Sequence, residues 1–95
     1  MLKANQKKQL KALAHDLKPI IQIGKDGLSD NLLMTIDQAL KAHELIKISV
    51  LQNNNDITEE LILDISSRTR SEFVFKIGRQ LIFYRPSKQK LIKLV

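Results

Sequence analysis

The sequence has no cysteine, and its only aromatic residues are three phenylalanines and one tyrosine. The lack of cysteine excludes disulfides, thiolate chemistry and cysteine-ligated zinc sites. The two histidines, His15 and His43, lie in separate predicted elements, and the carboxylates are spread over helices and turns without a recognisable acid–base pair. We therefore predict that the protein is not an enzyme and has no catalytic residue, metal site, cofactor or small-molecule substrate.

Long apolar runs are also missing. None approaches the roughly 20 residues that span a membrane, and the N-terminal residues lead into a lysine-rich amphipathic stretch rather than a signal-peptide core. A lysine-striped helix can lie on a membrane surface, but this stretch lacks the aromatic residues of interfacial helices. We expect a cytoplasmic protein without a membrane partner, folded as a single domain over residues 1–95 and acting as a monomer.

Positive charge is present in excess, and it lies at the two ends of the sequence. The net charge is +6, and the segments 1–25 and 66–95 carry +5 and +7, whereas the segment 26–65 carries −6. If the fold brings the termini together, these segments form one basic face, which is typical of proteins that bind nucleic acid or an anionic surface. A solvated basic surface without a partner is the alternative.

The first half of the chain predicts two helices and a strand between them. Apolar residues recur at helical spacing over residues 5–16 while lysines fall on another face, which indicates an amphipathic helix. Pro19 ends this helix, and the β-branched residues of 20–23 predict a first strand. Ser29 then caps a second helix, which we expect to run to about His43.

The second half predicts a strand, a helix and a hairpin. Residues 46–50 alternate between apolar and polar side chains, as in a strand with one buried face. Asp56 and Glu59 have the spacing of a capping box that opens a third helix, which ends near residues 68–70. Residues 73–85 predict a β-hairpin that turns at a glycine.

This order of elements indicates an α/β fold: a helix followed by β-α-β-α-β-β. Strand-helix-strand units cross over right-handed and place their strands parallel, whereas the two hairpin strands are antiparallel. Polar residues on the second and third strands suggest that only one face of the sheet is fully covered. We therefore predict a two-layer sandwich with a four-stranded mixed sheet.

The turn Gly24-Lys25-Asp26-Gly27 joins the first strand to the second helix. Glycines have no side chain to hold a ligand away, so the backbone N–H groups and the positive end of the helix dipole can approach a phosphate. Lys25 would add a mobile positive charge. The alternative is that the glycines serve only to turn the chain.

The aromatic residues have two alternative roles, which are stacking on RNA bases and packing in the core. Phe73, Phe75 and Phe83 resemble the base-stacking residues of sheet-based RNA binders, but so few aromatics are more useful in the core. Tyr84 is one position out of phase with Phe83 and is the better candidate for stacking on a base. His43 continues the apolar face of the second helix, which predicts partial burial.

Four stretches resemble the CRM domain, and specifically its stand-alone bacterial YhbY-like form, and the resemblance covers nearly the whole chain. It implies a fold similar to the C-terminal domain of bacterial translation initiation factor three. It also implies RNA binding, and the bacterial members look like assembly factors for the large ribosomal subunit. The stretches are Leu10-Lys11-Ala12-Leu13-Ala14-His15 with Leu17-Lys18-Pro19, Ile23-Gly24-Lys25-Asp26-Gly27-Leu28, His43-Glu44-Leu45-Ile46-Lys47, and Gly78 with Leu81-Ile82-Phe83-Tyr84-Arg85-Pro86.

The resemblance also implies the site. The GxxG loop of the family falls on Gly24, Lys25, Asp26 and Gly27, and Asp26 fits least well because a carboxylate repels phosphate unless it points away. The expected partner is ribosomal RNA of the precursor large subunit, and the alternative is a protein-interaction adaptor on ribosomal particles without RNA contacts of its own. The accompanying surface falls on Lys7, Lys8, Lys11, Lys18, Arg79, Tyr84, Arg85 and Lys88.

Overall fold

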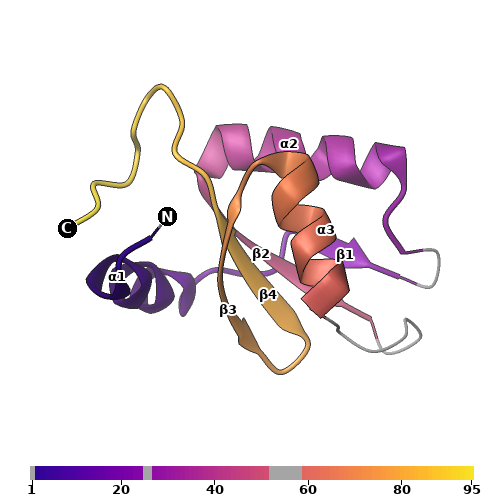
Figure 1. Ribbon diagram of the computed structural model, residues 1–95, viewed down its shortest axis with the longest axis horizontal. Coiled ribbons are helices and arrows are strands. Elements are labelled where there is room, and N and C mark those ends of the chain that lie inside the picture. Colours follow the sequence, from indigo (N-terminus) through magenta and orange to yellow (C-terminus); the bar gives the residue numbers. More distant parts are fainter. Residues whose placement is uncertain (1, 25–26, 52–58) are drawn as a thin grey trace.

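The computed structural model describes residues 2–24, 27–51 and 59–95, and its elements follow the predicted order (Figure 1). The first helix ends two residues earlier than predicted, and Asp56 of the predicted capping box lies outside the described residues. The elements are α1 (Ala4–Ala14), β1 (Ile21–Ile23), α2 (Asp30–His43), β2 (Leu45–Val50), α3 (Glu59–Thr69), β3 (Glu72–Ile77) and β4 (Gln80–Tyr84).

The four strands form one mixed sheet in the order β1-β2-β4-β3. β1 and β2 are parallel, as expected for a strand-helix-strand unit, and β3 and β4 are antiparallel, as expected for a hairpin. β4 also pairs antiparallel with β2, so it inserts between β2 and β3. The predicted α/β class and four-stranded mixed sheet are thus confirmed, while the similarity to translation initiation factor three stays a prediction.

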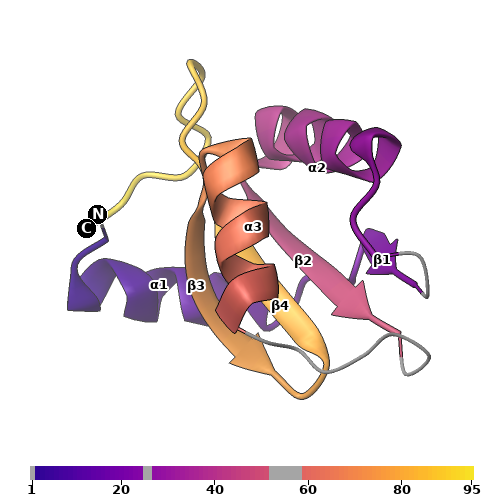
Figure 2. The same cartoon turned by 45° about the vertical axis from the view of Figure 1, so that its right-hand side comes forward.

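Helices α2 and α3 cover one face of the sheet (Figure 2). Ile36 and Ile65, one from each helix, are fully buried against strand residues such as Ile48. Phe83 is fully buried in this core and Phe73 is partly buried against it, with their ring centroids 5.6 Å apart and tilted by 59°. Both phenylalanines therefore contribute to packing, as we expected from the small number of aromatic residues.

Helix α1 lies on the opposite face of the sheet, which the predicted two-layer sandwich left open. Leu10 and Ala14 of α1 are fully buried against Ile82 and Tyr84, which alternate along β4 with the residues of the first core. The two predicted layers are present, and α1 adds partial cover on the second face. Within the described chain, no helix combines the length and the apolarity needed to cross a membrane.

The C-terminal segment 85–95 returns to α1 and brings the chain ends together (Figure 2). Gln6 Nε2 donates to the carbonyl of Val95 at 3.1 Å, and Gln9 Nε2 donates to the carbonyl of Lys93 at 2.8 Å. The Val95 N–H in turn donates to Gln9 Oε1 at 2.9 Å. The predicted basic face required the fold to bring the two chain ends together. This requirement is met, because both lysine-rich ends of the chain lie side by side.

A buried carboxylate, Glu44, holds the beginning of that segment in place. Glu44 is fully buried at the end of α2, and its backbone adopts a φ of 65°. Its carboxylate accepts the N–H groups of Ser87, Leu91 and Ile92 at 2.9, 3.0 and 2.9 Å, and also the Ser87 hydroxyl. Burial alone would raise the pKa of Glu44, but these hydrogen bonds outweigh it and lower the pKa to about 2.

Candidate nucleic-acid interface

A tight turn connects β1 to α2. The Gly27 N–H donates to the Gly24 carbonyl at 3.0 Å, and Gly27 has a φ of 69°, a conformation that glycine adopts at low cost. Lys25 and Asp26 lie outside the described residues. The predicted cap of α2 is confirmed, since Ser29 Oγ accepts the Leu32 N–H at 3.1 Å.

The two glycines of the turn present different sides to their surroundings. A Cβ atom added at Gly24 would lie 3.6 Å from the Leu51 side chain, which is an ordinary packing distance. A Cβ added at Gly27 would meet no atom within 4 Å among the described residues. Among the described residues, the side of Gly27 that would carry a Cβ atom is therefore open, whereas the corresponding side of Gly24 faces the protein.

Arg79 of the β3–β4 hairpin is bonded to the end of β2, which pairs with the strand that leads into this turn. Its Nε and Nη2 atoms donate to the carbonyls of Val50 and Leu51, each at 2.9 Å. Leu51 also donates its N–H to the carbonyl of Ile23 at 2.8 Å, just before the turn. Both acceptors are neutral carbonyls, so these two hydrogen bonds do not neutralise the charge of the guanidinium.

The predicted lysines of α1 are exposed, but they lie away from the Gly24–Gly27 turn. Lys7, Lys8 and Lys11 line α1, and the Lys11 Nζ lies 5.2 Å from the centroid of the Phe75 ring. Along the longest axis of the molecule, which extends 37 Å, Figure 1 shows α1 toward one end and the junction of β1 with α2 toward the other. Lys18 is also exposed, on the connection between them.

Tyr84 corrects one prediction. It is 3% exposed and packs between the sheet and α1, so its ring is not available to stack on a base. Burial raises the pKa of Tyr84, and the nearby negative charge of Glu44 raises it further. The predicted stacking role of Tyr84 is wrong because α1 covers the face of the sheet that we expected to be open.

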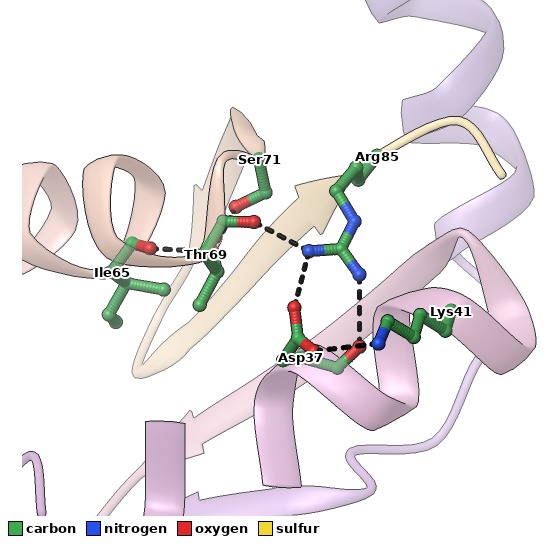
Figure 3. Close-up of polar contacts among 6 residues, drawn as sticks. All are labelled: Asp37, Lys41, Ile65, Thr69, Ser71 and Arg85. Carbon is green, nitrogen blue, oxygen red and sulfur yellow. Dashed lines mark hydrogen bonds and ion pairs between the residues drawn. The ribbon is translucent and has the colours of Figure 1, made fainter. Parts of the chain in front are cut away.

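The Arg85 side chain is bonded within the protein, where it links α2 to α3 (Figure 3). Its Nη1 atom donates to Asp37 Oδ1 at 2.7 Å and to the Thr69 carbonyl at 2.6 Å, and its Nη2 atom donates to the Asp37 carbonyl at 3.0 Å. The hydrogen bond from Arg85 lowers the pKa of Asp37, and the charges of Arg85 and Lys41 act in the same direction. We therefore leave Arg85 out of the proposed RNA contacts.

Two further expectations concern histidine and metal. His43 is exposed at the last position of α2, so the predicted partial burial is wrong; the chain turns sharply at Glu44, directly after it. Over the residues that the structure describes, no group of three or more potential metal-ligating side chains comes together.

Residues 2–85 match the family model described as the CRS1 / YhbY (CRM) domain. The chain belongs to the CRM domain family. This CRM domain is 44% identical over 93 residues to Probable RNA-binding protein YqeI of Bacillus subtilis, a match that covers 94% of this chain and 93% of the relative. It is also 39% identical over 93 residues to a protein of Haemophilus influenzae named RNA-binding protein. This match covers 98% of this chain and 94% of the relative.

A solved structure gives the same result for the fold. The solution structure of the protein SAV1595 of Staphylococcus aureus, for which RNA binding has been suggested, superposes on this CRM domain with a TM-score of 0.84. The two chains are 48% identical and cover each other completely. The resemblance that the four sequence stretches indicated is thus confirmed at the level of the family.

Proposed function

We propose that this CRM domain is a non-enzymatic RNA-binding protein that binds ribosomal RNA during assembly of the large subunit. The observation that carries the proposal is the open side of Gly27 in the turn that leads into α2, and Arg79, bonded to the end of β2, adds a positive charge at the neighbouring strand. The names of the relatives support RNA as the partner. The ribosomal part of the proposal depends on the resemblance to the bacterial YhbY-like proteins.

The mechanism is recognition of the RNA backbone. Phosphates approach the Gly24–Gly27 turn, where the glycine backbone, Lys25 and Arg79 receive them, and a second part of the RNA meets the exposed lysines of α1. Contacts of this kind supply affinity and orientation but little sequence selectivity. The proposed contact residues are Gly24, Lys25, Gly27, Lys7, Lys8, Lys11, Lys18, Arg79 and Lys88.

An adaptor that binds a protein partner is the competing function, and one surface favours it. Leu13, Leu17 and Ile20 are 46%, 36% and 52% exposed and line a groove of about 380 Å³ beside the start of β1. Exposed apolar residues gathered around a groove are typical of protein contacts. Treating isolated complexes with nuclease separates the two functions, because an adaptor keeps its partners and an RNA-bound protein loses them.

Replacing Gly27 with aspartate should weaken RNA binding about tenfold, whereas replacing it with asparagine should weaken it only slightly. Both side chains tolerate the left-handed backbone of Gly27 and have the same shape, so the two variants differ only in a negative charge that projects into open space. The measurement is the affinity for a fluorescein-labelled RNA hairpin at low salt.

Equal melting temperatures for the two variants serve as the folding control. If the aspartate and asparagine variants both bind the hairpin as tightly as the unaltered protein, RNA does not approach Gly27. The RNA site would then have to lie elsewhere on the molecule.

A further inference from the structure

A second basic site lies away from the Gly24–Gly27 turn, in a cleft of about 880 Å³ between the C-terminal ends of α2 and α3 and the segment after β4. Figure 3 shows part of its lining and the interactions beneath it. The lining residues include five basic side chains and a single carboxylate, Asp37. The basic ones are Lys41, Arg68, Arg70, Arg85 and Lys88.

The interior of the cleft is fixed by hydrogen bonds. Arg85 joins Asp37 of α2 to the Thr69 carbonyl of α3, and the Thr69 hydroxyl bonds to the Ile65 carbonyl at 2.6 Å. The same hydroxyl lies 2.7 Å from Ser71 Oγ. Because Arg85 is bonded to both helices, these hydrogen bonds restrict the separation of α2 and α3 at the cleft.

The charges around the cleft leave a clear positive excess. Five cations against Asp37 give +4, and the carboxylate of Glu44, which is bonded to Ser87 of the lining, reduces this to +3. The C-terminal ends of two helices subtract about half a charge each, which leaves about +2. Arg68 also lies 4.0 Å from Asp64, which reduces the excess by at most one further charge. Among the described residues, no hydrogen bond or ion pair engages the side chain of Arg70 or Lys88.

We propose that this cleft binds the phosphodiester backbone of the same RNA that meets the turn, so the inference depends on the proposed function. Eight of the twelve lining residues are exposed, so the cleft is an open surface and does not enclose a small molecule. Apart from Arg85, which is bonded within the protein, the cations are two arginines and two lysines, and the planar guanidinium groups of the arginines match phosphate oxygens in pairs.

The position of the cleft on α2 makes contact with one RNA feasible. The turn precedes the first residue of α2, Asp30, and Lys41 follows eleven residues later. At 1.5 Å per residue, the cleft lies about 16 Å along the helix axis from the turn. An RNA strand or groove edge that spans this length contacts both sites at once.

The test neutralises two exposed cations of the cleft, Arg70→Gln with Lys88→Gln. The control is Lys76→Gln with Lys90→Gln, which removes the same charge from exposed lysines outside the cleft. Binding is measured with a fluorescein-labelled RNA hairpin over a range of salt. We expect the cleft variant to bind about tenfold more weakly than the control, and its salt slope to fall by about 1 to 2.

A third variant separates RNA binding from stability. Asp37→Asn removes the negative charge paired with Arg85, which is the only carboxylate among the described residues that line the cleft, so it should tighten RNA binding several-fold while lowering the melting temperature. Glu60→Gln, an equal change of charge on the exposed first turn of α3, is its control.

The outcomes distinguish the inference from the proposed function. If the cleft variant and its control bind the hairpin equally and Asp37→Asn does not tighten binding, the inference is overturned while RNA binding at the turn stands. If the unaltered protein does not bind the hairpin even at low salt, both are overturned. Weaker binding by the cleft variant, together with tighter binding by Asp37→Asn, supports a second phosphate site.

Discussion

Replacing Glu44 with alanine should lower the free energy of unfolding by about 3 kcal/mol, because it removes the buried acceptor of four hydrogen bonds that hold the C-terminal segment. The carboxylate accepts three backbone N–H groups and the Ser87 hydroxyl, and the side chain is fully buried. Urea unfolding of the two proteins at neutral pH measures the difference. A loss of only a few tenths of a kcal/mol would contradict the role assigned to this carboxylate.

The effect of Glu44 should also depend on pH. Its pKa is lowered from 4.5 to about 2 in the folded protein, so its stabilising contribution is present above pH 4.5 and is lost as the pH falls toward 2. The stability difference between the unaltered protein and Glu44→Gln should therefore shrink over that window. A difference that stays constant from pH 5 to pH 2 would show that the charge of Glu44 is not what holds the C-terminal segment.

The backbone of Glu44 offers a matched control. Its φ of 65° and ψ of −44° form an unfavourable conformation for a residue with a side chain. Glu44→Gly removes the carboxylate but relieves this strain, so it should be about 1 kcal/mol less destabilised than Glu44→Ala. Equal losses in the two variants would assign the whole effect to the carboxylate.

Replacing Lys7, Lys8 and Lys11 together with glutamine should weaken RNA binding about a hundredfold at low salt, since each lysine that pairs with a phosphate releases about one counterion. These lysines are exposed on α1. The measurement is the affinity for the same labelled RNA hairpin. Unchanged affinity would remove α1 from the interface and leave the turn region as the main site.

Lys11 needs separate treatment because it also contributes to packing. Its ammonium lies over the Phe75 ring, a contact that contributes roughly 0.5–1 kcal/mol at an exposed site. The double variant Lys7→Gln with Lys8→Gln keeps that contact, and Lys76→Gln with Lys90→Gln removes the same charge elsewhere. The first pair should weaken binding clearly more than the second.

Local patterns in the sequence predicted the elements of this fold because each depends on residues close together in the chain. Alternation predicted the strand at 46–50, and Ser29 predicted the start of α2 through a hydrogen bond three residues away. The insertion of β4 between β2 and β3 was not predicted. The hairpin pattern pairs β3 with β4, but it does not indicate which of these two strands also pairs with β2.

The error at Tyr84 and the internal bonding of Arg85, which was not predicted, have one origin, which is packing between distant parts of the chain. Tyr84 is buried because α1 returns to the second face of the sheet, and Arg85 is engaged because Asp37, 48 residues earlier, lies opposite it. The role of Glu44 depends in the same way on N–H groups more than 40 residues later. Charge and spacing in the sequence indicated a basic protein, but they did not show which cations are already paired.

The dependence of RNA affinity on salt tests the central claim most directly. If about four to six phosphates are neutralised at the turn, on α1 and in the cleft, the logarithm of the affinity should fall with the logarithm of the salt concentration at a slope of roughly 3 to 5 in magnitude. The measurement uses the unaltered protein and the labelled RNA hairpin. An affinity that hardly changes with salt would contradict recognition of the RNA backbone by this CRM domain.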